Sequence, residues 1–182
     1  MLEYRRAQSS DAPVLAELRI EFMRIVKDGG IAGEAELRAE LRDRFAAELS
    51  AETMVAWICL DAGLVVAASG LGLPAVAAGT RVAGGASGAS GASEAGADGE
   101  AEALVFNMYT RASHRRRGIA SELLRLCLEE GRARGVLRFR LQSTDDGRGL
   151  YERAGFVDEG GDMVLRIQGR APARQPGAGL VP

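Results

Sequence analysis

The chain has 182 residues, 47% of them hydrophobic, so it is long enough for one domain with a buried core. Its formal net charge of −2 argues against a nucleic-acid-binding protein, because such proteins usually carry a basic stripe across the whole domain. No apolar run reaches the ~18–20 residues that span a membrane, and the opening residues, MLEYRRAQSSD, lack the apolar segment of a signal peptide.

The first third of the chain predicts one strand and two helices. Residues 2–7 are expected to form the strand, and Ser10 or Asp11 is the expected cap of a helix that runs to about Lys27. A second helix is indicated by charged residues between apolar residues at every fourth position. These apolar residues are Leu37, Leu41, Phe45 and Leu49.

Two apolar segments, residues 54–60 and 63–73, predict antiparallel strands joined by a turn at 61–63. Residues 74–100 follow, a low-complexity run of Ala, Gly and Ser with almost no bulky side chain from Thr80 onward. Because the segments on both sides of this run are strands that need partners, we interpret it as a mobile insertion within one domain.

The second half of the chain alternates strands and helices. The expected elements are a strand at 101–110, a helix from about 119, a strand at 136–144, a short helix at 147–155 and strands at 156–159 and 162–167. The strand–helix–strand order implies a parallel pair with a right-handed crossover, whereas the earlier hairpin implies antiparallel neighbours. We therefore predict an α/β fold whose mixed, mostly antiparallel sheet is flanked by helices on both faces.

This domain is expected to cover residues 1–168. The remaining residues, 169–182, hold three of the five prolines and are expected to be disordered. Cys59 and Cys127 lie in apolar runs and are expected to be buried reduced thiols, which fits a cytoplasmic location. Two cysteines and one histidine are too few for an ordinary four-ligand zinc site, so no metal is expected.

An arginine-rich turn, HRRRGIA at residues 114–120, separates the strand at 101–110 from its helix. The first amides of a helix have no internal partners and lie at the positive end of its dipole, so they bind anions. Gly118 and Ala120 allow a close backbone approach, and Arg115, Arg116 and Arg117 carry the charge that binds phosphate oxygens. The turn is typical of a pyrophosphate site, yet it is neither a Walker loop nor a G-x-G-x-x-G fingerprint.

At these residues the sequence resembles the GNAT superfamily of N-acetyltransferases. Its acetyl-CoA signature, Q/R-x-x-G-x-G/A at the start of a helix after a bulged strand, is matched by Arg115-x-x-Gly118-x-Ala120. The segment GRGLYERAGF at 147–156 is similar to the family's L-Y-x-x-x-G-F element. Together with the order of elements over residues 2–167, these motifs imply the family's acyl-CoA N-acyltransferase fold, whose sheet splays where the cofactor enters.

The resemblance implies roles for the matched positions. Backbone groups of Met108, Tyr109 and Thr110 would contact the pantetheine arm and thioester carbonyl of acetyl-CoA. The pyrophosphate would contact the amides of Arg116, Arg117, Gly118, Ile119, Ala120 and Ser121. Tyr151 occupies the position of the family tyrosine that protonates the leaving thiolate, a role that suits a phenol with a pKa near ~10.

The general base is left open by the resemblance. Glu102 lies on the central strand, further from the arginine-rich turn than the base glutamate of some relatives. Asn107 is closer to the turn and is a candidate to hold a water near the amine; a water-mediated base and an amine that arrives neutral are further alternatives. Many relatives have an asparagine about seven residues before the tyrosine, where this chain has Thr144.

The activity implied is direct transfer of an acetyl group from acetyl-CoA to a primary amine, without a covalent enzyme intermediate or a metal. The alternative is a non-catalytic acyl-CoA-binding module, a sensor or a partner-binding subunit. The acceptor stays open among small amines, amino acids, antibiotics and protein N-termini, because the segments expected to line its cleft carry no transferable motif. The resemblance also implies a homodimer as a common family assembly; no nucleic acid or membrane partner is expected.

Overall fold

The computed structural model describes residues 1–27, 30–73 and 101–167. Its strands are β1 (Leu2–Arg6), β2 (Met54–Asp61), β3 (Leu64–Gly72), β4 (Glu102–Thr110), β5 (Arg138–Leu141), β6 (Val157–Glu159) and β7 (Asp162–Arg166). Its α-helices are α1 (Ala12–Val26), α2 (Glu34–Ser50), α3 (Ile119–Ala133) and α4 (Asp145–Arg153). The insertion expected at 74–100 and the tail expected at 169–182 lie outside the described residues.

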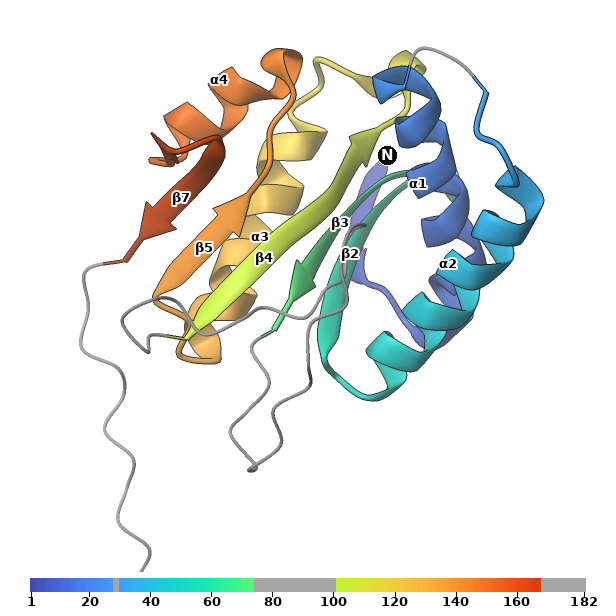
Figure 1. Cartoon of the computed structure of the whole chain (residues 1–182), viewed down its shortest axis with the longest axis horizontal. Coiled ribbons are helices and arrows are strands. Elements are labelled where there is room, and N and C mark those ends of the chain that lie inside the picture. The colour runs from blue at the N-terminus through green and yellow to red at the C-terminus, as the bar shows by residue number, and fades with distance from the viewer. Residues whose placement is uncertain (28–29, 74–100, 168–182) are drawn as a thin grey trace, which may run out of the picture.

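The strands form one mixed sheet in the order β1-β2-β3-β4-β5-β7-β6. Its neighbours pair antiparallel except β4 and β5, which are parallel and connected through α3. In Figure 1, α3 lies behind the sheet, while α1 and α2 lie on the other side, at the right of the view. The expected α/β architecture and the expected order of strands and helices are therefore confirmed.

The layer formed by α1 and α2 follows the apolar periodicity of the sequence. Leu41 and Phe45 of α2 are buried in one cluster with Leu15 and Leu18 of α1. The predicted cap of α1 is only half right. Asp11 holds the N-cap position but makes no side-chain cap bond, because its carboxylate accepts hydrogen bonds from the Arg5 guanidinium and the Gln8 amide.

The hairpin of β2 and β3 turns where the sequence predicts. Ala62 and Gly63 both have positive φ values, 50° and 81°, as expected for a two-residue turn that matches the twist of its strands. Cys59 and Cys127 are free and buried, as predicted. No helix within the described ranges has the length and apolar character needed to cross a membrane.

The sheet opens between β4 and β5. These strands pair only where Glu102–Leu104 face Arg138–Arg140, so the rest of β4 has no partner on this edge among the described residues. On its other edge β4 stays paired with β3 as far as Thr110. Figure 1 shows the C-terminal half of β4 running away from β5, toward the end of the molecule where α3 begins.

The packing of α3 on the sheet gives a direct test of this arrangement. A Cβ atom added at Gly131 would overlap the Phe139 ring of β5 and would lie 3.4 Å from Leu71 Cδ2. At Gly149, in α4, the nearest atom is the mobile end of Arg153, at 3.3 Å. We expect Gly131→Ala to lower the free energy of unfolding by about 1–3 kcal/mol and Gly149→Ala to keep or slightly raise it, as measured by urea denaturation. Equal effects of the two substitutions would contradict this packing.

Candidate functional site

The open half of β4 presents backbone groups to the gap. The Arg111 amide donates to the Val66 carbonyl at 3.0 Å, which directs the backbone groups of Arg111 toward β3. Because these directions alternate along a strand, Tyr109, which lies opposite Ala68, also points its amide toward β3. The amides of Met108 and Thr110 therefore face the gap. Met108, Tyr109 and Thr110 were predicted to contact the pantetheine arm and the thioester carbonyl. Of these three residues, Met108 and Thr110 have amides that face the gap.

A β-bulge at Asn107 produces this arrangement. Asn107 has a φ of 52°, and the register with β3 shifts between Ala68 and Gly70. The bulge interrupts side-chain alternation, so that Phe106 and Asn107 both face the layer of α1 and α2. Asn107 is 5% exposed, and its Nδ2 donates to the Leu15 carbonyl at 3.4 Å. Its Oδ1 is buried and has no donor among the described residues.

The loop between β4 and α3 has the geometry of an anion site. Arg116 and Gly118 are both in the left-handed region, with φ values of 63° and 78°. Within the described part of the chain, the amides of residues 116–121 have no backbone acceptor, and the next amide, that of Glu122, donates to the Gly118 carbonyl. The space at the Cβ position of Gly118 is open. Free amides at a helix start, with room in front of them, fit a pyrophosphate group.

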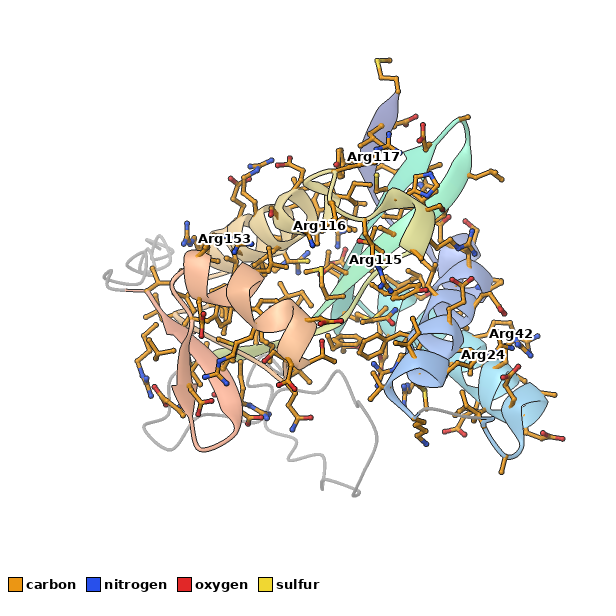
Figure 2. All side chains as sticks on the ribbon, turned by 90° about the horizontal axis from the view of Figure 1, so that it is seen from above. Arg24, Arg42, Arg115, Arg116, Arg117 and Arg153 are labelled. Atoms are coloured by element: carbon orange, nitrogen blue, oxygen red, sulfur yellow. The ribbon has the colours of Figure 1, made fainter. Side chains whose placement is uncertain are left out.

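The three arginines of the turn have different surroundings (Figure 2). Arg115 donates to the Thr110 carbonyl at 3.0 Å and stacks on the Tyr109 ring. Arg117 pairs with Asp61 at the β2–β3 hairpin, and this pairing lowers the pKa of that carboxyl. Arg116 makes no such contact within the described residues. Two of the three arginines thus have partners within the protein, and the binding of phosphate by these side chains stays a prediction.

Tyr151 of α4 lies on the α3 side of the sheet, in one buried cluster with Cys127 and Phe139. It is 6% exposed, and its ring contacts Phe156 edge to face. Burial raises the pKa of Tyr151 to about 12, with a smaller contribution from Cys127. The phenol therefore keeps its proton throughout the physiological pH range.

A polar contact that the sequence did not reveal lies in the same layer. Ser69 of β3 and Cys127 of α3 are both buried, and Ser69 Oγ lies 3.1 Å from Cys127 Sγ. Burial raises the pKa of the Cys127 thiol to about 12, so this thiol is not a nucleophile at neutral pH. The serine lies opposite the bulge, a position that sequence spacing alone does not identify.

The structure does not bring Glu102 to this site. Glu102 is the first residue of β4, eight residues before Thr110, which corresponds to about 26 Å of extended strand. Its two oxygens pair with Arg138 and Arg140, each at 3.0 Å. Those arginines also pair with Glu159 and Asp162, so Glu102 belongs to an ion-pair cluster at the far end of the sheet.

On the other face of β4, Tyr109 packs against Phe22 of α1, with ring centroids 6.1 Å apart. Burial raises the pKa of Tyr109, and the nearby Glu21 carboxylate adds to this effect. Glu21 is itself engaged by the Arg111 guanidinium at 2.8 Å. This pair fixes the end of β4 to α1.

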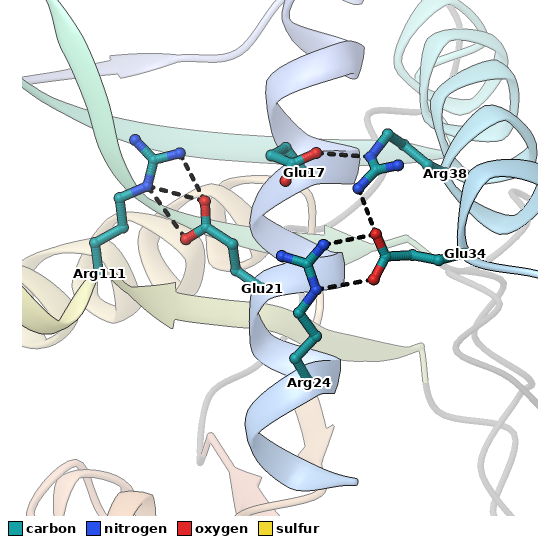
Figure 3. Close-up of polar contacts among 6 residues, drawn as sticks. All are labelled: Glu17, Glu21, Arg24, Glu34, Arg38 and Arg111. Carbon is teal, nitrogen blue, oxygen red and sulfur yellow. Dashed lines mark hydrogen bonds and ion pairs between the residues drawn. The ribbon is translucent and has the colours of Figure 1, made fainter. Parts of the chain in front are cut away.

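Ion pairs continue from α1 to α2 (Figure 3). Glu34 accepts hydrogen bonds from Arg24 and Arg38, and Arg38 also donates to Glu17. Glu17 and Glu21 are the two acidic residues of α1. The structure shows both in ion pairs, and these pairings depend on contacts between segments distant in the sequence.

A groove of about 290 Å³ lies between α3 and α4, next to the arginine-rich turn. Its lining residues are Ser121, Leu124, Arg125, Leu128, Glu129, Arg132, Leu150, Arg153 and Ala154. Over residues 1–27, 30–73 and 101–167, no group of three His, Cys, Asp or Glu side chains is placed to hold a metal ion.

A protein-family model and several solved structures match this chain. The model of the acetyltransferase (GNAT) family matches residues 34–156. A GCN5-related N-acetyltransferase from Ralstonia eutropha JMP134 is 22% identical, with a TM-score of 0.66 over 88% of this chain and 95% of that one. A predicted acetyltransferase from Clostridium acetobutylicum, solved with acetyl-CoA, is 21% identical, with a TM-score of 0.66 over 88% and 92%.

The PaiA N-acetyltransferase of Thermoplasma acidophilum, solved with coenzyme A, is 13% identical, with a TM-score of 0.63 over 92% of this chain and 98% of that one. No curated protein matches the sequence. At these identities the structural matches establish a shared fold.

The positive φ of Asn107 in the β-bulge can be tested by substitution. A β-branched residue cannot adopt a φ of 52° without strain, whereas glycine adopts it freely. Both Asn107→Val and Asn107→Gly lose the hydrogen bond to Leu15, so the difference between them does not come from that bond. We expect the valine variant to be about 1–3 kcal/mol less stable than the glycine variant in urea denaturation. Equal stability would show that the bulge is not held at this residue.

Proposed function

The chain belongs to the acetyltransferase (GNAT) family, and from this premise we propose that it transfers an acetyl group from acetyl-CoA to a primary amine. One observation carries the proposal. The unpaired amides of β4 that face the gap and the free amides of residues 116–121 lie on either side of the same short connection, where a thioester and a pyrophosphate of one ligand would need them. The relatives solved with acetyl-CoA and coenzyme A support this assignment.

In this proposal the pantetheine arm lies in the gap between β4 and β5. The Met108 and Thr110 amides donate to the arm and to the thioester carbonyl. An amide fixed in a strand is oriented before the reaction, so it stabilises the negative charge that develops on the thioester oxygen without reorganisation. The amine nitrogen forms the new C–N bond as the C–S bond breaks.

Tyr151 is the proposed donor to the leaving sulfur. Its pKa of about 12 lies above the ordinary range of a thiol, so the phenol is protonated whenever a thiolate leaves. A donor with so high a pKa first stabilises the thiolate by hydrogen bonding. Sulfur then takes the proton as the amide product forms, and the phenolate is reprotonated by solvent or by the proton released from the amine.

The acceptor is proposed to approach from the face that carries Asn107 and Tyr109. Asn107 Oδ1 is a buried acceptor with no donor among the described residues, so a water or an N–H of the acceptor amine, which has lost its ammonium proton to solvent, is the donor that it lacks. We propose that it orients this donor beside the thioester. Glu102 has no part in this step, because it lies at the opposite end of β4.

A non-catalytic acyl-CoA-binding module is the second candidate. It is favoured by one observation, namely that Glu21, the carboxylate beside Tyr109, is already held by Arg111. Both functions require binding of acetyl-CoA, but only the acetyltransferase transfers the acetyl group to an amine. An assay that measures binding and turnover together therefore separates them.

The assay follows release of the coenzyme A thiol over a panel of amines, in parallel with calorimetric binding of acetyl-CoA. Both cysteines of the protein are buried, so a thiol reagent reports the released thiol. We expect Tyr151→Phe to lower kcat by about 10²–10⁴-fold with an unchanged Kd for acetyl-CoA. Tyr4→Phe on β1 is the matched control and should retain full activity.

Unchanged turnover in Tyr151→Phe would remove the acid assignment. Binding of acetyl-CoA by the unmodified protein without turnover of any amine would identify the binding module instead.

A further inference from the structure

An arginine lies on the face of α1 that packs against β4. Leu15, Arg19 and Phe22 are four and then three residues apart, so they share one face of the helix. The Leu15 carbonyl accepts the hydrogen bond from Asn107 Nδ2 at 3.4 Å. The Phe22 ring contacts the Tyr109 ring. Arg19 thus lies between two points at which α1 contacts the bulged half of β4, on the face proposed for the acceptor.

This arginine has no anionic partner. Among the described residues, the half-buried Arg19 makes no ion pair and no hydrogen bond, and its guanidinium lies over the Phe22 ring, 5.5 Å from the centroid. Burial lowers the pKa of Arg19, and the like charge of Arg44 adds to this effect. Arg44 itself is paired with Glu48. A guanidinium held away from water without a carboxylate is destabilising, and a bound anion would relieve this cost.

The carboxylates of α1 are held by other arginines. Glu17 pairs with Arg38 of α2 at 2.7 Å. Glu21 pairs with Arg111 at the end of β4 at 2.8 Å. The face of α1 toward β4 therefore presents a cation to the acceptor, which favours an acceptor that carries a negative group besides its amine.

The second polar group of this face is Asn107, whose buried Oδ1 is proposed to orient the acceptor amine. Asn107 is bonded to Leu15, and Arg19 lies one helical turn further along α1, about 6 Å along the axis. An acceptor whose amine meets Asn107 can reach Arg19 when its anionic group lies only a few bonds from the amine. Amino acids have this arrangement, because their amine and carboxylate share one carbon.

We propose that Arg19 binds the carboxylate of the acceptor and that the acceptors are amino acids. This inference rests on the proposed function, since it names the substrate class of the same site. A planar guanidinium binds a carboxylate through two parallel hydrogen bonds, so it fixes the orientation of the acceptor as well as its affinity. Arg19 has no part in proton transfer; it selects among amines and turns the amine toward the thioester.

The test compares kcat/KM for L-amino acids with kcat/KM for the corresponding L-amino acid amides, measured by release of the coenzyme A thiol on the full chain. The amide replaces the carboxylate by a neutral group of similar size. We expect Arg19→Gln to lower the ratio of the two values about 10–100-fold, chiefly through a higher KM for the amino acid, with an unchanged Kd for acetyl-CoA. Arg42→Gln is the matched control and should leave the ratio unchanged, because Arg42 is exposed on α2 and pairs with the adjacent Asp43 (Figure 2).

A second variant and a thermal readout separate specificity from folding. Arg19→Lys keeps the charge but cannot form the two parallel hydrogen bonds, so it should retain part of the preference. Because Arg19 has no anionic partner among the described residues, neither substitution is expected to lower the unfolding midpoint of the acceptor-free protein. A lower midpoint together with loss of acetyl-CoA binding in both variants would show that Arg19 supports the fold and would overturn its assignment.

The remaining outcomes separate this inference from the function on which it rests. The carboxylate assignment is overturned, while acetyl transfer stands, by an unchanged ratio in Arg19→Gln or by an equal fall in Arg42→Gln. Turnover confined to amines without a carboxylate, or faster turnover of aminoalkylphosphonates than of amino acids, overturns it as well. A protein that binds acetyl-CoA but acetylates no amine overturns the proposed function and this inference with it.

Discussion

The parting of β4 from β5 is the constraint on which the rest of the molecule depends. Two parallel strands that stayed paired would satisfy every backbone amide on the facing edges, and nothing would be left to bind a ligand. Here pairing stops after Leu104, and the bulge at Asn107 turns the remaining strand so that the Met108 and Thr110 amides face an open gap. The crossover through α3 places the start of that helix at the same end of the gap. The site is therefore made largely of main-chain groups, and its side chains shape and close it.

Main-chain sites of this kind are held in place by packing and by ion pairs around them. Arg111 and Glu21 join the end of β4 to α1, and Glu34 with its two arginines joins α1 to α2. The pKa of Glu34 is lowered chiefly by its hydrogen bond from Arg24. On the other face, Ser69, Cys127 and Tyr151 lie among apolar residues, and burial keeps the thiol and the phenol protonated. The gap thus has one face with ion pairs and another that is apolar, which suits an amine on the first and a thioester on the second.

The sequence predicted those features that depend on local periodicity and turn chemistry. The stripe from Leu37 to Leu49, the Ala62-Gly63 turn and the glycine before α3 each follow from neighbouring residues, and each was predicted in place. The end of β5 was not predicted correctly. The strand was expected over 136–144, but it ends at Leu141, close to the point where its pairing with β4 stops. The partners of Asp11, Arg115 and Arg117 within the protein were not predicted, since Arg5, Thr110 and Asp61 reach them only in the folded chain. For the same reason, Glu102 could not be separated from the site by sequence alone.

The central claim is that the free amides of residues 116–121, around Gly118, bind the pyrophosphate of acetyl-CoA. Calorimetric titration of acetyl-CoA against the Gly118→Glu variant tests this claim most directly. The variant places a carboxylate in open space before the free amides, at a φ of 78°. Gly160→Glu is a matched control, because Gly160 has a φ of 68° and open space in the β6–β7 turn. We expect binding by the unmodified protein and by Gly160→Glu, and loss of binding in Gly118→Glu. Equal binding by all three folded proteins, or by none of them, would contradict it.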